Sequence, residues 1–252
     1  MRKLILLVFF TVASIFSNAQ NGDQILIAAA SDLKFALDSI VTAFKKDYPD
    51  ARVDVTYGSS GKLFEQISHS APFDLFFSAD IEYPLNLKEK GIAVADVHTY
   101  GVGRVVIWSQ IIDPNKEQIN SLLDKTINKI AIANPQHAPY GRRAEEALKH
   151  YKIYEKIKSK LVYGENISQT AQFVTVGAAD AGIIALSLAL SPAMKKLNGH
   201  YYVIPEDAHK PLKQGFVLLK NAERNSLAGA FRDFMLGAEA TKILNHFGFT
   251  KK

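Results

Sequence analysis

Four short segments of this chain place small or hydroxyl-bearing residues where a predicted strand ends and a predicted helix begins. The segments are Ala29–Leu33, Tyr57–Lys62, Asn134–Gly141 and Gly164–Ser168. The start of a helix carries unpaired backbone N–H groups and about half a positive charge, so it attracts anions. If the four segments meet in the folded protein, they form a receptor for an oxyanion that needs neither a metal ion nor an arginine.

The turn Gly58-Ser59-Ser60-Gly61 carries the most specific local signal. Its glycines let the backbone approach a ligand closely, and its serines add two hydroxyl donors. The turn is not a P-loop, because only two residues separate the glycines and an apolar residue follows Lys62. It also lacks the Gly-x-Ser-x-Gly pattern of a nucleophile elbow. A serine hydrolase that uses Ser59 or Ser60, with His137 as its base, stays open as an alternative of another class.

The other three segments offer donors of two kinds. Ser31 follows the apolar run Ile25–Ala29 and precedes a periodic helix, so we expect it to cap that helix. Its hydroxyl and its N–H group are then available at the helix start. Tyr140 and Ile167 lie at the starts of two further helices, where we expect them to contribute backbone N–H groups whatever their side chains are.

Asp32 is an acidic residue directly beside these donors. A carboxylate about 5 Å from a dianion costs several kcal/mol at an effective dielectric constant near 20. We therefore expect its side chain to point outward while its N–H group faces the ligand; otherwise the site holds a cation. Asp74, Asp80 and Glu165, also near strand ends, keep a metal-cation receptor open as an alternative. The seven histidines, however, show no metal-ligand spacing.

Residues 1–19 have the pattern of a secretory signal peptide. Arg2 and Lys3 precede the apolar run Leu4–Phe16, and Ser17–Ala19 supplies small residues for cleavage. The run is short for a membrane span, and the chain has no cysteine for a lipid anchor. We expect a soluble periplasmic protein without disulfides, with an uncleaved anchor as the alternative. The net charge of +5, partly in the signal peptide, does not favour binding to nucleic acid.

Short β-branched or aromatic runs alternate with amphipathic patterns along the chain. The predicted strands are Ile25–Ala29, Arg52–Tyr57, Asp74–Ser78, Val105–Trp108, Lys129–Ala133, Lys160–Tyr163, Gly182–Leu186, Tyr201–Ile204 and Gly215–Leu219. Helices are predicted between them, and the last two span Ser226–Leu236 and Ala238–Phe247, with Gly248 as a left-handed cap. The alternation predicts an α/β protein with mixed, mostly parallel sheets flanked by helices.

The chain is expected to form two lobes with a ligand cleft between them. Gly101–Arg104 is predicted to cross from one lobe to the other, and the polar, proline-flanked stretch Pro205–Pro211 to return. Lobe I then comprises residues 20–102 and 211–252, and lobe II comprises residues 103–210. Ligands of such folds bind outside the carboxyl ends of the strands, which is where the four segments lie.

With these segments in view, the chain resembles the periplasmic molybdate-binding proteins of ABC importers, from about Ile25 to Phe249. The resemblance is carried by Ala28–Ser31, Gly58–Gly61, Ala71–Asp80, Asn134–Gly141 and Phe247–Phe249. It implies a two-lobed periplasmic-binding-protein fold of type II that closes around molybdate or tungstate. It also implies a membrane permease as partner, a monomer, no cofactor and no enzymatic activity. A receptor for sulfate, phosphate or another oxyanion is the alternative among binding proteins.

The resemblance also assigns residues to the ligand. Ser31 and Ser60 correspond to positions that bind the oxyanion through hydroxyl and N–H groups, and Tyr140 and Ile167 to positions that bind through N–H. In some members the residue after the first serine contributes too, which nominates Asp32 here. In one branch a tyrosine hydroxyl contacts the anion from the strand that reads Gly182–Ala185 in this chain, and Ala185 cannot donate that bond.

Overall fold

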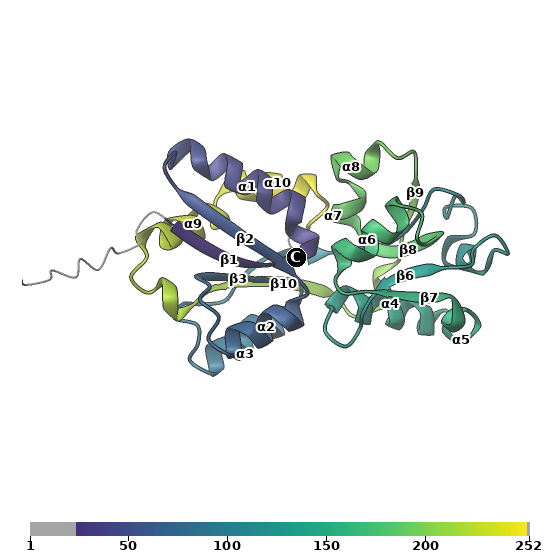
Figure 1. The fold of residues 1–252 in the computed structure, drawn as a ribbon, viewed down its shortest axis with the longest axis horizontal. Helices are drawn as coiled ribbons and strands as arrows, with labels where there is room; N and C mark the ends of the chain where they lie inside the picture. The colour runs from purple at the N-terminus through teal and green to yellow at the C-terminus, as the bar shows by residue number, and fades with distance from the viewer. Residues whose placement is uncertain (1–23, 251–252) are drawn as a thin grey trace, which may run out of the picture.

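The protein, described here as a computed structural model over residues 24–250, consists of two lobes, each built around a five-stranded sheet (Figure 1). The predicted signal peptide, residues 1–19, lies outside the described residues. In lobe I the strand order is β2-β1-β3-β10-β4, with β1 Gln24–Ala30, β2 Arg52–Gly58, β3 Leu75–Ser78, β4 His98–Gly103 and β10 Leu212–Leu218. In lobe II the order is β7-β6-β8-β5-β9, with β5 Val105–Ser109, β6 Ile130–Ala133, β7 Leu161–Gly164, β8 Ala181–Ala185 and β9 His200–Val203.

Helices cover both faces of each sheet (Figure 1). They are α1 Lys34–Asp47, α2 Ser60–Ser68, α3 Glu82–Glu89, α4 Pro139–His150, α5 Tyr154–Ile157, α6 Ile167–Thr175, α7 Leu186–Ala189, α8 Pro192–Lys195, α9 Ser226–Leu236 and α10 Ala238–His246. The alternation of side chains along β3 divides the core of lobe I: Phe77 packs with α1, α9 and α10, while Phe76 packs with α2 and α3. The two-lobed α/β fold predicted from the sequence is confirmed.

Each sheet is mixed because the strands next to the crossovers run against their neighbours. β1 pairs in parallel with β2 and β3, and β6 pairs in parallel with β7 and β8. β10, which brings the chain back to lobe I, is antiparallel to β3 and β4, and β5, which opens lobe II, is antiparallel to β8 and β9. Each of the nine predicted strands overlaps an observed one.

The first crossover lies at Arg104, the last residue of the predicted stretch Gly101–Arg104. Residues 101–103 belong to β4, which pairs with β10 from Leu212 onward, so only Arg104 separates β4 from β5. The second crossover is the stretch between β9 and β10. Arg104 joins the two crossovers, because its guanidinium lies 3.0 Å from the Glu206 carboxylate and donates to the Ile204 carbonyl. The residue boundaries expected for the two lobes stay a prediction.

Within residues 24–250, none of the helices combines the length and the apolar character that crossing a bilayer requires.

Candidate functional site

A small cavity lies between the two lobes, where the four segments identified in the sequence come together. Lobe I lines it with Ala30, Ser31, Asp32, Gly58, Ser59, Ser60 and Ala79, and lobe II lines it with Ala138, Pro139, Tyr140 and Ile167. Every residue that the sequence nominated for the ligand is in this set. The nominated residues are also all buried, so a ligand held among them is removed from bulk water.

Three helices begin at the wall of the cavity. Ser60 is the first residue of α2, Tyr140 the second of α4 and Ile167 the first of α6. The first four N–H groups of a helix have no acceptor within that helix, so these residues can donate backbone hydrogen bonds into the space between them. The helix dipoles add partial positive charge at the same place. The cavity is therefore suited to an anion, which side chains of neutral residues and backbone amides would hold.

Ser31 is not the helix cap that the sequence predicts. The helical turn that precedes α1 starts at Ser31 itself, and the hydroxyl makes no capping hydrogen bond. The hydroxyl instead reaches lobe II, where it donates to Asn166 Oδ1 over 3.1 Å and accepts from the Ser168 N–H over 3.3 Å. The Ser168 hydroxyl donates back to the Ser31 carbonyl over 2.8 Å. Ser31 therefore joins the two lobes at the edge of the cavity.

The two serines of the Gly58–Gly61 turn differ in their hydrogen bonds. Ser60 Oγ accepts from the Ala79 N–H over 3.0 Å, and its own proton has no acceptor among the described residues. Ser59 Oγ lies 2.9 Å from His137 Nδ1, on the other lobe, so its hydroxyl is already engaged. Ser60 therefore has a proton to give to a ligand, and both residues line the cavity.

The sequence analysis expected the Asp32 carboxylate to point outward. The carboxylate is buried instead, and the residue is 1% exposed. Oδ2 accepts from the Tyr140 hydroxyl over 3.0 Å and from Gln214 Nε2 over 2.8 Å, while Oδ1 has no partner among the described residues. Burial raises the pKa of Asp32 to about 7, although the two hydrogen bonds favour the charged form. The correction matters for an anion site, because burial favours the protonated form of this carboxyl group, and that form does not repel the ligand.

Sequence reasoning missed Gln214 and Tyr100, which complete this buried cluster. Gln214 is a fully buried amide in β10, where it follows Lys213, and its Oε1 accepts from the Tyr100 hydroxyl over 2.6 Å. A glutamine directly before the apolar run Gly215–Leu219 is the signal that could have found it, since a buried amide requires partners. Both residues support Asp32 and Tyr140 and do not line the cavity themselves.

Comparison with known proteins places the chain in a family. Residues 25–250 match the family of bacterial extracellular solute-binding proteins. The chain belongs to this family. Two relatives named molybdate-binding protein ModA are similar over most of its length. The protein from Rhodobacter capsulatus is 37% identical over 78% of this chain and 77% of its own. The protein from Azotobacter vinelandii is 32% identical over 94% of each chain.

The solved structure of the Azotobacter vinelandii periplasmic molybdate-binding protein superimposes on this solute-binding protein with a TM-score of 0.83, covering 90% of this chain and 99% of that chain at 28% identity. The family and the fold agree with the resemblance drawn from the sequence motifs. A solute-binding protein captures its ligand and does not transform it, so the protein is not an enzyme.

A triad-like arrangement in this solute-binding protein does not meet the requirements of a serine hydrolase. Ser59 lies against His137, and the Glu165 carboxylate lies near the far side of the ring, but His137 Nε2 and Glu165 Oε2 are 3.9 Å apart. That distance is too long for the hydrogen bond that orients the histidine of a triad. Glu165 pairs with Lys62 across the cleft instead.

The carboxylates that kept a metal-cation receptor open are engaged elsewhere. Asp74 accepts from the Leu26 N–H over 2.7 Å, Asp80 pairs with Arg142, and Glu165 pairs with Lys62. In the part of the chain from residue 24 to 250, no three His, Cys, Asp or Glu side chains are grouped as a metal ion would need. The cavity is thus better suited to an anion than to a cation.

Ala185 ends β8, is fully buried and pairs with Val105. It is not among the residues that line the cavity. This strand therefore supplies no hydroxyl to the site.

Proposed function

We propose that this protein is the substrate-binding component of an ABC importer and that it captures molybdate or tungstate outside the cytoplasm. The proposal is supported most by one observation: the starts of α2, α4 and α6 and the hydroxyl of Ser60 converge on one buried cavity between two lobes. Two relatives that share at least 32% identity with the chain are named molybdate-binding proteins, which supports the choice of ligand.

In this mechanism the anion enters the open cleft and is enclosed when the lobes close about the crossovers beside Arg104. Ser31 and Ser60 bind it from lobe I through hydroxyl and N–H groups, and Tyr140 and Ile167 bind it from lobe II through N–H groups. Donors from both lobes are satisfied together only in the closed form, so the ligand stabilises closure by its differential affinity for that form. Asp32 and Ser59 line the same cavity without a donor assigned to the anion.

Neutral donors suit a receptor that must later release its cargo. Each hydrogen bond to a charged group contributes roughly 1.5–3 kcal/mol, so affinity accumulates from several groups without a buried cation. An arginine or lysine buried against the dianion would add a desolvation penalty in the empty protein. Selectivity over sulfate follows from size, because rigid donors placed for the longer metal–oxygen bonds cannot follow a smaller ion inward without losing hydrogen bonds.

The partner in this scheme is the membrane permease of the importer, and the protein acts as a monomer in the periplasm. One relative is named a putative ABC transporter substrate-binding lipoprotein, which supports the transporter as the setting. Size-exclusion chromatography with light scattering tests the monomer, and fractionation of the host cell tests the compartment.

Isothermal titration calorimetry on the mature, dialysed protein tests the ligand. We expect molybdate and tungstate to bind with one ion per chain, and sulfate and phosphate to bind at least about a hundredfold more weakly, because a misplaced oxygen forfeits one or two charged hydrogen bonds. Tight binding of sulfate or phosphate with no heat from molybdate would assign the protein to another oxyanion.

A further inference from the structure

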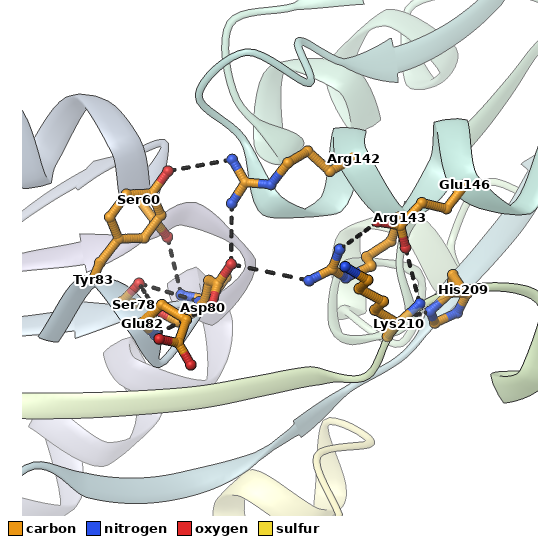
Figure 2. A network of polar contacts seen from close by, with 11 residues as sticks. Ser60, Ser78, Asp80, Glu82, Tyr83, Arg142, Arg143, Glu146, His209 and Lys210 are labelled. Carbon is orange, nitrogen blue, oxygen red and sulfur yellow. Dashed lines mark hydrogen bonds and ion pairs between the residues drawn. The ribbon is translucent and has the colours of Figure 1, made fainter. Parts of the chain in front are cut away.

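Asp80 is an acidic residue that directly follows Ala79 of the cavity wall and that the proposed function does not use. It ends the segment Ala71–Asp80, and its position is fixed on two sides. Its Oδ1 accepts from the Glu82 N–H over 3.2 Å, and its backbone N–H donates to Ser78 Oγ over 3.1 Å. Its remaining oxygen, Oδ2, faces lobe II (Figure 2).

Arg142 of α4 meets that oxygen from the other lobe. Its Nη2 donates to Asp80 Oδ2 over 3.1 Å, and its Nη1 donates to the Tyr83 hydroxyl over 3.3 Å (Figure 2). The guanidinium thus holds two side chains of lobe I at once. Arg142 lies two residues after Tyr140, in the first turn of α4, so this contact fixes the end of α4 that borders the cavity.

The same network continues to the second crossover. Arg143 Nη2 lies 4.0 Å from Asp80 Oδ2, and Arg143 Nη1 donates to Glu146 over 2.7 Å. The other oxygen of Glu146 accepts from the Lys210 N–H over 2.9 Å, in the stretch that returns the chain to lobe I (Figure 2). Lobe I, α4 and the return crossover are therefore connected by one series of charged contacts.

A second ion pair crosses the cleft between Lys62 and Glu165, but it is far more exposed. Its side chains are 54% and 44% exposed, against 30% for Arg142 and 17% for Asp80. Exposed ion pairs contribute little, because water and salt screen them and both side chains lose conformational freedom. Asp80 and the two arginines that face it from lobe II, Arg142 and Arg143, are less exposed, so water and salt screen their contacts less.

We propose that Asp80 and Arg142 form an interlobe latch, which holds the start of α4 against lobe I and so positions the Tyr140 N–H group at the anion. The two are positioning residues and do not touch the ligand. The part of the inference that concerns binding rests on the proposed function. Opening the lobes about the crossovers separates Asp80 from Arg142, so this pair adds to the other interlobe contacts and raises the fraction of the ligand-free protein that is closed. Apparent affinity is proportional to that fraction.

The effect of the latch on affinity can be separated from the direct effect of charge on the anion. Removing the negative charge of Asp80 reduces repulsion of a dianion, and removing the positive charge of Arg142 reduces attraction to it. Charge alone therefore predicts that Asp80→Asn tightens binding and that Arg142→Gln weakens it. The latch predicts that both variants weaken binding. Asn keeps the oxygen that accepts from the Glu82 N–H, so the start of α3 is preserved.

The experiment compares Asp80→Asn, Arg142→Gln, the double variant and Lys149→Gln with the unchanged protein. Lys149 pairs with Glu145 on the same helix and within one lobe, so its loss is a matched change of charge without an interlobe contact. Small-angle X-ray scattering of the ligand-free proteins reports closure, calorimetry reports molybdate affinity, and thermal unfolding confirms that each variant is folded.

We expect the ligand-free Asp80→Asn and Arg142→Gln proteins to have larger radii of gyration than the Lys149→Gln control. Each single variant should bind molybdate about tenfold more weakly. This loss lies between the small loss expected when an exposed ion pair is broken and the large loss expected for a buried one. The double variant should be no weaker than either single one.

Unchanged radii, or tighter binding by Asp80→Asn, would overturn the latch. If the unchanged protein bound no molybdate, the proposed function would fail, and scattering would still decide whether the latch exists. If one variant did not fold, the other would decide alone.

Discussion

The buried Asp32 carboxyl predicts that anion binding depends on pH near neutrality. Its pKa is raised to about 7 by burial, and no Lys, Arg or His hydrogen-bonds to it among residues 24–250. The groups that face it are neutral: Tyr140 from α4, Gln214 from β10, Tyr100 behind Gln214, and Ser187 from α7, whose hydroxyl donates to the Asp32 carbonyl. A dianion in the adjacent cavity disfavours the charged carboxylate further, so the bound form should keep the proton.

The sign and size of the effect follow from linkage. Below pH 7 the free protein already carries the proton, and binding is unaffected by Asp32. Above pH 7 the fraction of free protein that carries the proton falls about tenfold with each pH unit, and only that fraction binds without a further cost. Affinity for molybdate should therefore fall by about 30-fold between pH 6 and pH 8.5. Molybdate remains a dianion over this range, so the ligand itself does not titrate.

Calorimetry in buffers of different ionisation enthalpy measures the proton directly. At pH 8 we expect nearly one proton to be taken up per molybdate bound, and the Asp32→Asn variant to take up none. Asn can still accept from Tyr140 and Gln214 through its carbonyl oxygen, so the cluster keeps its contacts. An affinity that does not change with pH, or an equal pH dependence in Asp32→Asn, would refute the reasoning.

The same variant gives a check without ligand. The pKa of Asp32 is higher in the folded protein than the ordinary value of 3.8, so the folded state holds a proton that the unfolded state releases. Stability is therefore fully present below about pH 4 and declines as pH rises to about 7, by at most about 4 kcal/mol. Asp32→Asn should raise the free energy of unfolding at pH 8 and change it little at pH 4. Urea unfolding at the two pH values measures this difference.

The remaining predictions concern single groups. Ser60→Ala should weaken molybdate binding by about 1.5–3 kcal/mol in calorimetry, the contribution of a hydrogen bond to a charged group. Ile167→Val keeps the N–H group and should change the affinity little. The opposite pattern would show that the anion binds elsewhere. Gly103→Ala should lower the melting temperature markedly, because its Cβ would lie 2.3 Å from the Tyr140 hydroxyl. Gly229→Ala, whose Cβ meets nothing within 4 Å, is the control, and equal melting temperatures would contradict this packing.

The features predicted well from the sequence are those that depend on local patterns. The helix predicted over Ser226–Leu236 has those bounds, and Gly248 has the positive φ of 81° expected of a left-handed cap. β4 was missed because His98–Gly103 contains two glycines and lacks a run of β-branched residues. Its conformation depends on pairing with β10, more than a hundred residues later in the chain.

The features of the site that the sequence could not give are contacts between distant residues. The hydroxyl of Ser31 was expected to cap its own helix, and it reaches Asn166 on the other lobe instead. The environment of Asp32 depends on Tyr140 and Gln214, which follow it by 108 and 182 positions. Residue type at a strand end could nominate Ser31 and Asp32 for the site, but it carries no information about which partner each side chain meets.

The hydrogen bonds of the ligand-free site imply that its donors do not contribute equally. Ser31 already donates its proton to Asn166, so binding through that hydroxyl exchanges one hydrogen bond for another. The proton of Ser60 has no acceptor among the described residues, so its bond to an anion is a net gain. Because the contact that Ser31 would give up joins the two lobes, the anion must replace it as a bridge between them. In the proposed latch, the Asp80–Arg142 pair retains the closed arrangement during this exchange, which gives charged residues a role near a site of neutral donors.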